Sequence, residues 1–127
     1  MKFTSANNGE ATSLLPYQER LIGNPETGAL HSGAVTSLLD TTCGLAVVSA
    51  MSAPQALATL DLRIDFLAAS SPGLELRARA ECYKKTSDIA FVRAIAYHGD
   101  ESNPIATCAA TFMLRTDVPP ALEREPT

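Results

Sequence analysis

Cysteine is scarce in this chain of 127 residues, and its three cysteines are poorly placed for cross-linking or metal binding. Cys43, Cys82 and Cys108 are odd in number, lie far apart and form no CxxC pair. Disulfide frameworks use paired cysteines and structural zinc sites use closely spaced ones, so the sequence predicts neither. We expect no metal and no bound redox cofactor.

Basic residues and long apolar runs are scarce as well. Ten Lys and Arg stand against 14 Asp and Glu, a formal net charge of −4, whereas a protein that binds nucleic acid needs a basic face. No apolar run approaches the roughly 20 residues of a membrane span. Residues 1–10 lack the apolar stretch of a signal peptide. We therefore expect no nucleic-acid partner, no membrane partner and a cytoplasmic location.

The rest of the composition is typical of a globular protein, with 46% apolar and 19% charged residues. A chain of this length holds one hydrophobic core, so residues 1–127 are predicted to form a single domain. The first ten residues and residues 118–127 are polar or proline-bearing, and we expect both to be loosely held. The ordered core then spans about residues 11–116.

Residues 32–51 have the periodicity of a long helix. Ser32 is the expected N-cap, and Pro54 cannot continue the helix. One face recurs at three- and four-residue spacing and consists of Val35, Leu38, Leu39, Thr42, Leu45 and Ala46.

After this helix the period changes from 3.6 to 2, which indicates strands with one buried and one exposed face. Leu60, Leu62, Ile64 and Phe66, for example, alternate with charged residues. Four strands are expected over residues 60–67, 74–83, 89–98 and 105–114, and a first one over residues 11–22, where Pro16 requires an edge or a bulge.

The predicted order is therefore β-α-β-β-β-β. The antiparallel sheet has an apolar face to bury, and the long helix is the only element available to cover it. We predict an α+β fold in which one helix lies in the concave side of a curled sheet.

A carboxylate, Asp40, interrupts the apolar helix, and it shares a stripe of small or polar residues with Ser37 and Gly44. On composition alone, a solvated helix residue is the favoured interpretation. The alternative is a partly buried carboxylate that acts as a general base or as a nucleophile. Cys43, three residues further on, is interpreted as a small buried hydrophobe.

The stretch NPETGALHSGAVTSLLD, residues 24–40, resembles the motif of the hotdog-fold acyl-CoA thioesterases, specifically their PaaI-like (phenylacetate-degradation) branch. That family has an asparagine, a short loop, LHGG and a carboxylate nine residues after the histidine. The resemblance extends over about residues 11–116 and implies the hotdog fold. The matching residues here are Asn24, His31, Ser32, Gly33 and Asp40.

This resemblance implies a thioester hydrolase whose substrate carries coenzyme A. Asp40 would act as general base or nucleophile, and His31 would orient its loop. Backbone amides near Ser32 and Gly33 would stabilise the charge that develops on the carbonyl oxygen. Ser32 replaces a glycine of the family pattern but keeps the backbone N–H. Thr59 matches a family hydroxyl position and would hold the attacking water near Asp40.

Helix geometry then predicts an oligomer. Nine residues of helix rise about 13 Å, so His31 and Ser32 cannot reach the same thioester as Asp40 within one protomer. A second chain must complete the site, and hotdog family members form dimers with sites at the interface. We expect a homodimer, or a homotetramer built from such dimers.

Other assignments have two interpretations. Asn24 either contacts substrate or only forms a turn, and Lys84 and Lys85 either meet the phosphates of coenzyme A or only face solvent. Small or medium, aryl or alkyl acyl groups all remain open. One alternative to the enzyme is a hotdog protein that binds acyl-CoA or another apolar ligand without turnover. A hotdog dehydratase is a third possible function, after the thioesterase and the binding protein, but the sequence lacks the HxGxPxxPG-like stretch of that branch.

Overall fold

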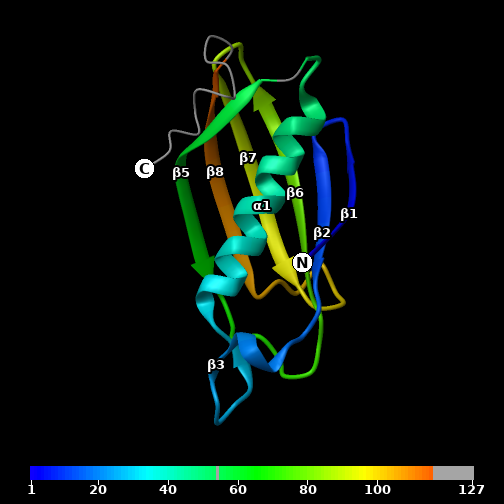
Figure 1. Cartoon of the computed structure of the whole chain (residues 1–127), viewed down its shortest axis with the longest axis vertical. Helices are drawn as coiled ribbons and strands as arrows, with labels where there is room; N and C mark the ends of the chain where they lie inside the picture. The colour runs from blue at the N-terminus through cyan, green and yellow to red at the C-terminus, as the bar shows by residue number, and fades with distance from the viewer. Residues whose placement is uncertain (54, 116–127) are drawn as a thin grey trace, which may run out of the picture.

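The computed structural model describes residues 1–53 and 55–115, in which one long helix packs on a curled antiparallel sheet (Figure 1). The six strands of this sheet lie in the order β1-β2-β6-β7-β8-β5. A two-stranded sheet, β3 (Ile22–Asn24) and β4 (Ala29–Leu30), leads into helix α1 (Ser32–Ala50). The remaining strands are β1 (Lys2–Asn7), β2 (Glu10–Leu15), β5 (Ala56–Phe66), β6 (Leu76–Lys85), β7 (Ile89–Tyr97) and β8 (Ala106–Arg115). The predicted fold, a helix in the concave side of a sheet, is confirmed.

A tight hairpin joins β1 to β2. Asn8 and Gly9 have φ values of 51° and 88°, and a two-residue type I′ turn requires positive φ at both central positions. The Gly9 N–H donates to Ser49 Oγ at 2.8 Å, which ties the turn to the last turn of α1. The prediction that the first ten residues are loosely held, with an ordered core from about residue 11, is therefore wrong for β1.

The side of the sheet that faces the helix is rich in alanine. Ala78 and Ala80 of β6 and Ala94 and Ala96 of β7 are buried there. Because these side chains are small, α1 lies close to the strands and its larger side chains fill the space between them. Of the predicted helix face, only Leu45 is half-buried. The buried residues of α1 are Val35, Leu38, Leu39, Thr42, Cys43, Ala46 and Val47.

Strand β5 departs from the predicted alternation. It is an edge strand, and β8 is its only neighbour in the described sheet. Leu60 and Phe66, which were predicted to be buried, are 49% and 50% exposed. A bulge at Leu60, where the pairing steps from Thr59 to Asp61, also breaks the alternation. The sequence pattern does not produce burial here because nothing in the described chain covers this edge.

The predicted first strand is also shorter than expected. β2 ends at Leu15 and a 3-10 helix, η1, follows at Glu19–Leu21. Pro16 has no N–H to donate to a neighbouring strand, so the pairing stops before it.

Helix α1 is long and apolar enough, by length and composition, to cross a membrane, although no uninterrupted apolar run of that length occurs in the sequence. Leu38, Leu39 and Val47 of α1 are fully buried against the sheet. The core helix of a folded domain has the same length and composition. The tail predicted over residues 118–127 lies outside the described residues.

Candidate active site

The start of α1 presents one free backbone donor. His31, not the predicted Ser32, is the N-cap, and its Nδ1 accepts a hydrogen bond from the Gly33 N–H at 2.9 Å. The Ala34 N–H donates to the His31 carbonyl oxygen at 2.9 Å. Within the described chain this leaves the Ser32 N–H without a partner. The helix dipole adds positive potential at this point, and no acidic residue lies in the first turn.

The β3–β4 hairpin holds this end of the helix in place. The His31 N–H donates to the Leu21 carbonyl oxygen at 2.7 Å. A Cβ atom added to Gly23 would lie 2.7 Å from His31 Cα, so only glycine fits between β3 and His31. Gly23 was not among the predicted site residues, because a glycine in IGN looks like any loop glycine in the sequence.

We therefore expect Gly23→Ala to lower thioester hydrolysis by about tenfold to a hundredfold, because the added methyl group displaces His31 and with it the Ser32 N–H. Steady-state hydrolysis measured by thiol release checks this. Gly99→Ala is the control, since a Cβ there meets nothing within 4 Å. Equal activity of the two variants would contradict the packing argument.

Asp40 lies near the middle of α1 and is half-buried. Thr59 on β5 donates its hydroxyl to Asp40 Oδ1 at 3.4 Å, a long and therefore weak hydrogen bond. The structure thus brings together the two side chains that the sequence paired. The bulge at Leu60 directly follows Thr59, and bulges often re-aim a side chain beside an active site.

The Ser32 N–H and Asp40 lie on one continuous helix, as predicted. Eight residues separate them, which corresponds to a rise of about 12 Å. They cannot contact one carbonyl group within a protomer.

A pocket of about 310 Å³ lies beside Ser32, at the start of α1. Most of its wall is apolar, and Asp40 is not part of it. Its lining includes Leu30, Val35, Phe66, Leu67, Ile105 and Ser70. An apolar group attached to a carbonyl at the Ser32 N–H would be close to this pocket.

Cys43 follows Asp40 by three residues but is unsuited to nucleophilic attack. Its side chain is 0% exposed. A hydrogen bond with Cys108, together with burial, raises the pKa of the Cys43 thiol, so the reactive thiolate is disfavoured at neutral pH. This supports its interpretation as a buried hydrophobe.

Within one protomer, the structure does not bring the predicted substrate-binding residues close to the Ser32 N–H or to the Asp40 carboxylate. Asn24 is exposed, and its Oδ1 accepts the Glu26 N–H at 3.0 Å, which is the geometry of a turn. Lys84 and Lys85 are exposed at the end of β6, which lies at the far end of the sheet from the start of α1 (Figure 1).

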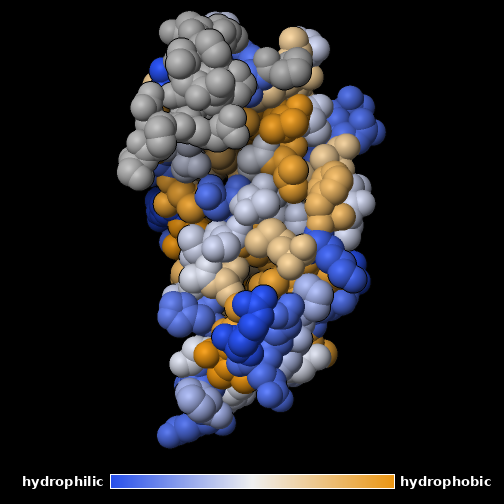
Figure 2. Space-filling model, in the orientation of Figure 1, coloured by the Kyte–Doolittle hydropathy of each residue, from blue (hydrophilic) through white to orange (hydrophobic). Residues whose placement is uncertain are grey.

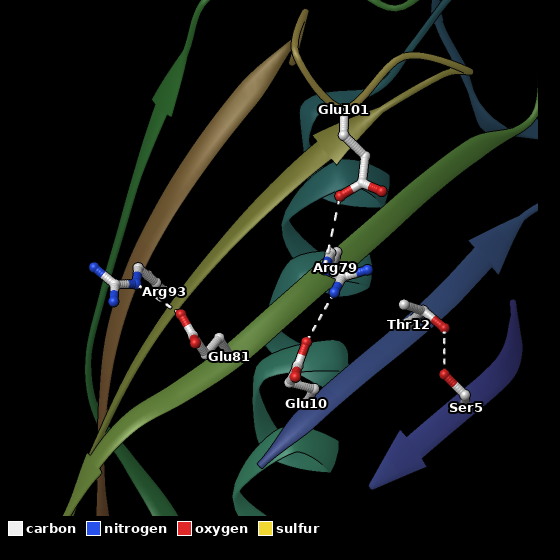
Figure 3. Close-up of polar contacts among 7 residues, drawn as sticks. All are labelled: Ser5, Glu10, Thr12, Arg79, Glu81, Arg93 and Glu101. Carbon is white, nitrogen blue, oxygen red and sulfur yellow. Dashed lines mark hydrogen bonds and ion pairs between the residues drawn. The ribbon is translucent and has the colours of Figure 1, made fainter. Parts of the chain in front are cut away.

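The face of the sheet that points away from α1 has a depression of about 480 Å³, larger than the pocket beside Ser32. The charged side chains that line it are paired. Arg79 lies 2.8 Å from Glu10 and 3.7 Å from Glu101, and Arg93 lies 3.0 Å from Glu81 (Figure 3). Since each arginine already faces a carboxylate, this face offers little net positive charge to a phosphate.

Comparison with known proteins assigns the family. The model of the thioesterase superfamily matches residues 27–105, which include Ser32, Asp40 and Thr59. The chain belongs to the thioesterase superfamily. A Pseudomonas aeruginosa protein of known crystal structure is 40% identical, with a TM-score of 0.79 over 87% of this chain and 82% of the other.

Further relatives of this thioesterase superfamily member carry functional names. A Halobacterium salinarum protein named as an esterase is 42% identical over 65 residues, which are 49% of this chain but only 43% of that protein. A Ralstonia eutropha protein named for phenylacetic acid degradation is 22% identical, with a TM-score of 0.74 over 87% of this chain and 82% of the other. A Streptococcus mutans protein crystallised with acetyl-CoA is 19% identical, with a TM-score of 0.78 over 91% and 90%. These two structures share the fold.

The predicted membership of the hotdog thioesterases, a family of thioester hydrolases, is thereby confirmed. The roles of the site residues stay predictions. Within residues 1–53 and 55–115 no three His, Cys, Asp or Glu side chains cluster as metal ligands would.

Proposed function

We propose that this thioesterase-superfamily chain hydrolyses an acyl-CoA thioester to the free acid and coenzyme A. The observation that carries the proposal is the pairing of the Asp40 carboxylate of α1 with the Thr59 hydroxyl of β5, while the first N–H of α1 has no partner in the described chain. Thioester hydrolysis needs both of these chemical functions: a carboxylate that activates the attack and a donor for the developing oxyanion. The acetyl-CoA bound by the Streptococcus mutans protein of the same fold supports coenzyme A as the leaving group.

In this mechanism the Ser32 N–H donates to the thioester carbonyl oxygen as negative charge develops on it. As a general base, Asp40 takes a proton from water while the hydroxide adds to the carbonyl carbon. The C–S bond then breaks, and the thiolate takes the proton back from Asp40. As a nucleophile, Asp40 instead attacks the carbonyl carbon, the C–S bond breaks to release the coenzyme A thiolate, and water hydrolyses the resulting anhydride to the free acid and the Asp40 carboxylate. Thr59 orients the water or the carboxylate in either route, and no metal or redox cofactor is involved.

Because Ser32 and Asp40 are too far apart within one protomer, the proposed site lies between two copies of the chain. Two surfaces near these residues are open to a second copy. One is the edge of β5 that pairs with no described strand, where Leu60, Phe66 and the following residue Leu67 are 49%, 50% and 58% exposed. Exposed apolar residues on an edge strand are usual at an interface.

The other open surface is the outer side of α1. No described strand covers it, and Figure 2 shows apolar and weakly polar surface side by side there. Ser37 is exposed, and a Cβ on Gly44 would meet nothing within 4 Å. Small residues on this side of Asp40 leave room for the thioester and for the loop of a partner.

The substrate is proposed at the level of its class. The apolar pocket of about 310 Å³ beside Ser32 suits a small or medium acyl or aryl group. Lys84 and Lys85 are too far from Ser32 in the same protomer to assist there, so any contact with the coenzyme A phosphates would come from the partner. We place the reaction in the cytoplasm.

A panel of acyl-CoA thioesters tests this function. Acetyl, butyryl, hexanoyl, benzoyl and phenylacetyl thioesters are each incubated with the protein, and released thiol is measured. Hydrolysis of at least one at a rate well above the spontaneous rate is expected. Tight binding of these thioesters without any turnover would favour the binding protein over the enzyme.

Assembly is the next prediction. We expect light scattering to show a dimer or tetramer at micromolar concentration, because the proposed site uses Ser32 of one copy and Asp40 of another. A fully active monomer would contradict the shared site.

A mixture of two inactive variants tests directly whether two copies share the site. Ser32→Pro and Asp40→Asn proteins are unfolded together, refolded and assayed. A mixed dimer then has one site with both changes and one with neither, so about a quarter of the wild-type activity should return. Sites built within one protomer would give no recovery.

A further inference from the structure

One connection crosses the end of the sheet at which α1 begins (Figure 1). Residues 67–75, here called the strap, join β5 to β6, which are separated in the sheet by β8 and β7. The strap supplies Leu67, Ala68, Ala69 and Ser70 to the wall of the apolar pocket beside Ser32.

The first half of the strap is tied to the loop that carries His31. The buried Ser70 accepts a hydrogen bond from the Leu30 N–H on its Oγ at 2.8 Å, and Leu30 directly precedes His31. Pro72 packs against the same hairpin, because a Cβ on Gly28 would lie 2.8 Å from Pro72 Cβ. A shift of the strap therefore shifts the start of α1.

His98, which directly follows β7, closes the second half of the strap. Its Nε2 accepts the Ser71 N–H at 2.9 Å, and its Nδ1 lies 2.9 Å from the Glu75 carbonyl oxygen. A carbonyl only accepts, so Nδ1 carries the proton and Nε2 is the bare nitrogen. These two bonds bracket the Pro72–Gly73 turn, in which Gly73 has a φ of 77°.

We propose that His98 is a positioning residue for the thioesterase reaction, an inference that rests on the proposed function. By holding the strap at Ser71 and Glu75, it sets the place of Ser70. Through the Ser70–Leu30 bond it sets the place of the Ser32 N–H. His98 itself transfers no proton to substrate, because both ring nitrogens are engaged by the strap.

Three variants test this. His98→Ala removes both bonds, whereas His98→Gln keeps an acceptor for the Ser71 N–H. Asp100→Ala is the control, because Asp100 holds the neighbouring turn through Ser102 and makes no bond to the strap. We expect kcat of His98→Ala to fall at least about tenfold, since small misplacements of a catalytic group have such effects.

We further expect His98→Gln to recover most of that loss and Asp100→Ala to stay within about twofold of wild type. Thermal melting monitors the fold of each variant. Wild-type kcat in His98→Ala, an equal loss in Asp100→Ala, or no recovery in His98→Gln would each overturn the proposal.

Amide hydrogen exchange separates this proposal from the proposed function. In His98→Ala, exchange at Ser71 and at Leu30 should accelerate relative to wild type, while His98→Gln should preserve most of the protection. Unchanged exchange at Leu30 would overturn the link between His98 and the start of α1, whatever the activity. Absence of hydrolysis by wild-type protein, with the exchange result as expected, would overturn the proposed function instead.

Discussion

Asp40→Asn should lower the hydrolysis of acyl-CoA by at least about a hundredfold, the usual loss when a general base or its charge is removed. Asparagine keeps the shape of the side chain and still accepts a hydrogen bond from Thr59, so the fold and substrate affinity should change little. Rates of thiol release give the loss of activity, and calorimetric titration with a slowly hydrolysed analogue gives the affinity.

Asp88→Asn is the matched control, since it makes the same chemical change at an exposed turn between β6 and β7. It should hydrolyse acyl-CoA like wild type. If Asp40→Asn also hydrolyses every thioester as well as wild type, Asp40 is only a polar residue of the helix, and its role as general base or nucleophile is overturned.

Ser32→Pro should cost orders of magnitude in kcat, because proline removes the one backbone N–H at the helix start that has no partner among the described residues and can stabilise the oxyanion. Ser32→Gly should keep most of the activity, since the donor belongs to the backbone and not to the hydroxyl. The pair therefore separates the backbone group from the side chain in a single assay.

Proline is well tolerated at the first position of a helix, so Ser32→Pro should melt close to the wild-type temperature. Equal activity of the proline and glycine variants would remove the N–H of Ser32 from the mechanism. The Gly33 N–H could not take its place without breaking its bond to His31 Nδ1.

The sequence predicted the parts of the fold in which a single period decides burial. The 3.6-residue period over 32–51 identified α1 and most of its buried side, and the sequence also predicted β6 to β8, with strict alternation in β6. β6, β7 and β8 are inner strands of the sheet and α1 packs on that sheet, so each of these elements buries one side. Pattern and burial therefore agree.

The prediction failed where edges and turns decide the structure. β1 alternates weakly, and only Ala6, near its end, is partly buried. The Asn8–Gly9 pair that follows is nevertheless a strong hairpin signal, which could have revealed the strand. The exposed side of β5 could not be predicted, because alternation does not tell an edge strand from a central one.

The candidate site was predicted in part for a similar reason. The spacing within the motif placed Asp40 on α1, and Thr59 was assigned next to it. The cap at His31 is local, but serine is a commoner N-cap than histidine, so the sequence favoured Ser32 instead. The contacts of Gly23 with His31 and of His98 with Ser71 join different elements, for which no local pattern exists.

The bulge at Leu60 also bears on how the protein would distinguish its own copies from related chains. A straight strand laid along β5 can pair regularly on only one side of the kink. A second copy carries the same kink at the same residue, so in the proposed dimer a two-fold axis at Leu60 would match one irregularity with the other. A paralogue whose edge strand is regular, or is kinked one residue away, would meet unpaired N–H groups there. The bulge would therefore select for self-association over mixed assembly in a cell that contains several proteins of this fold.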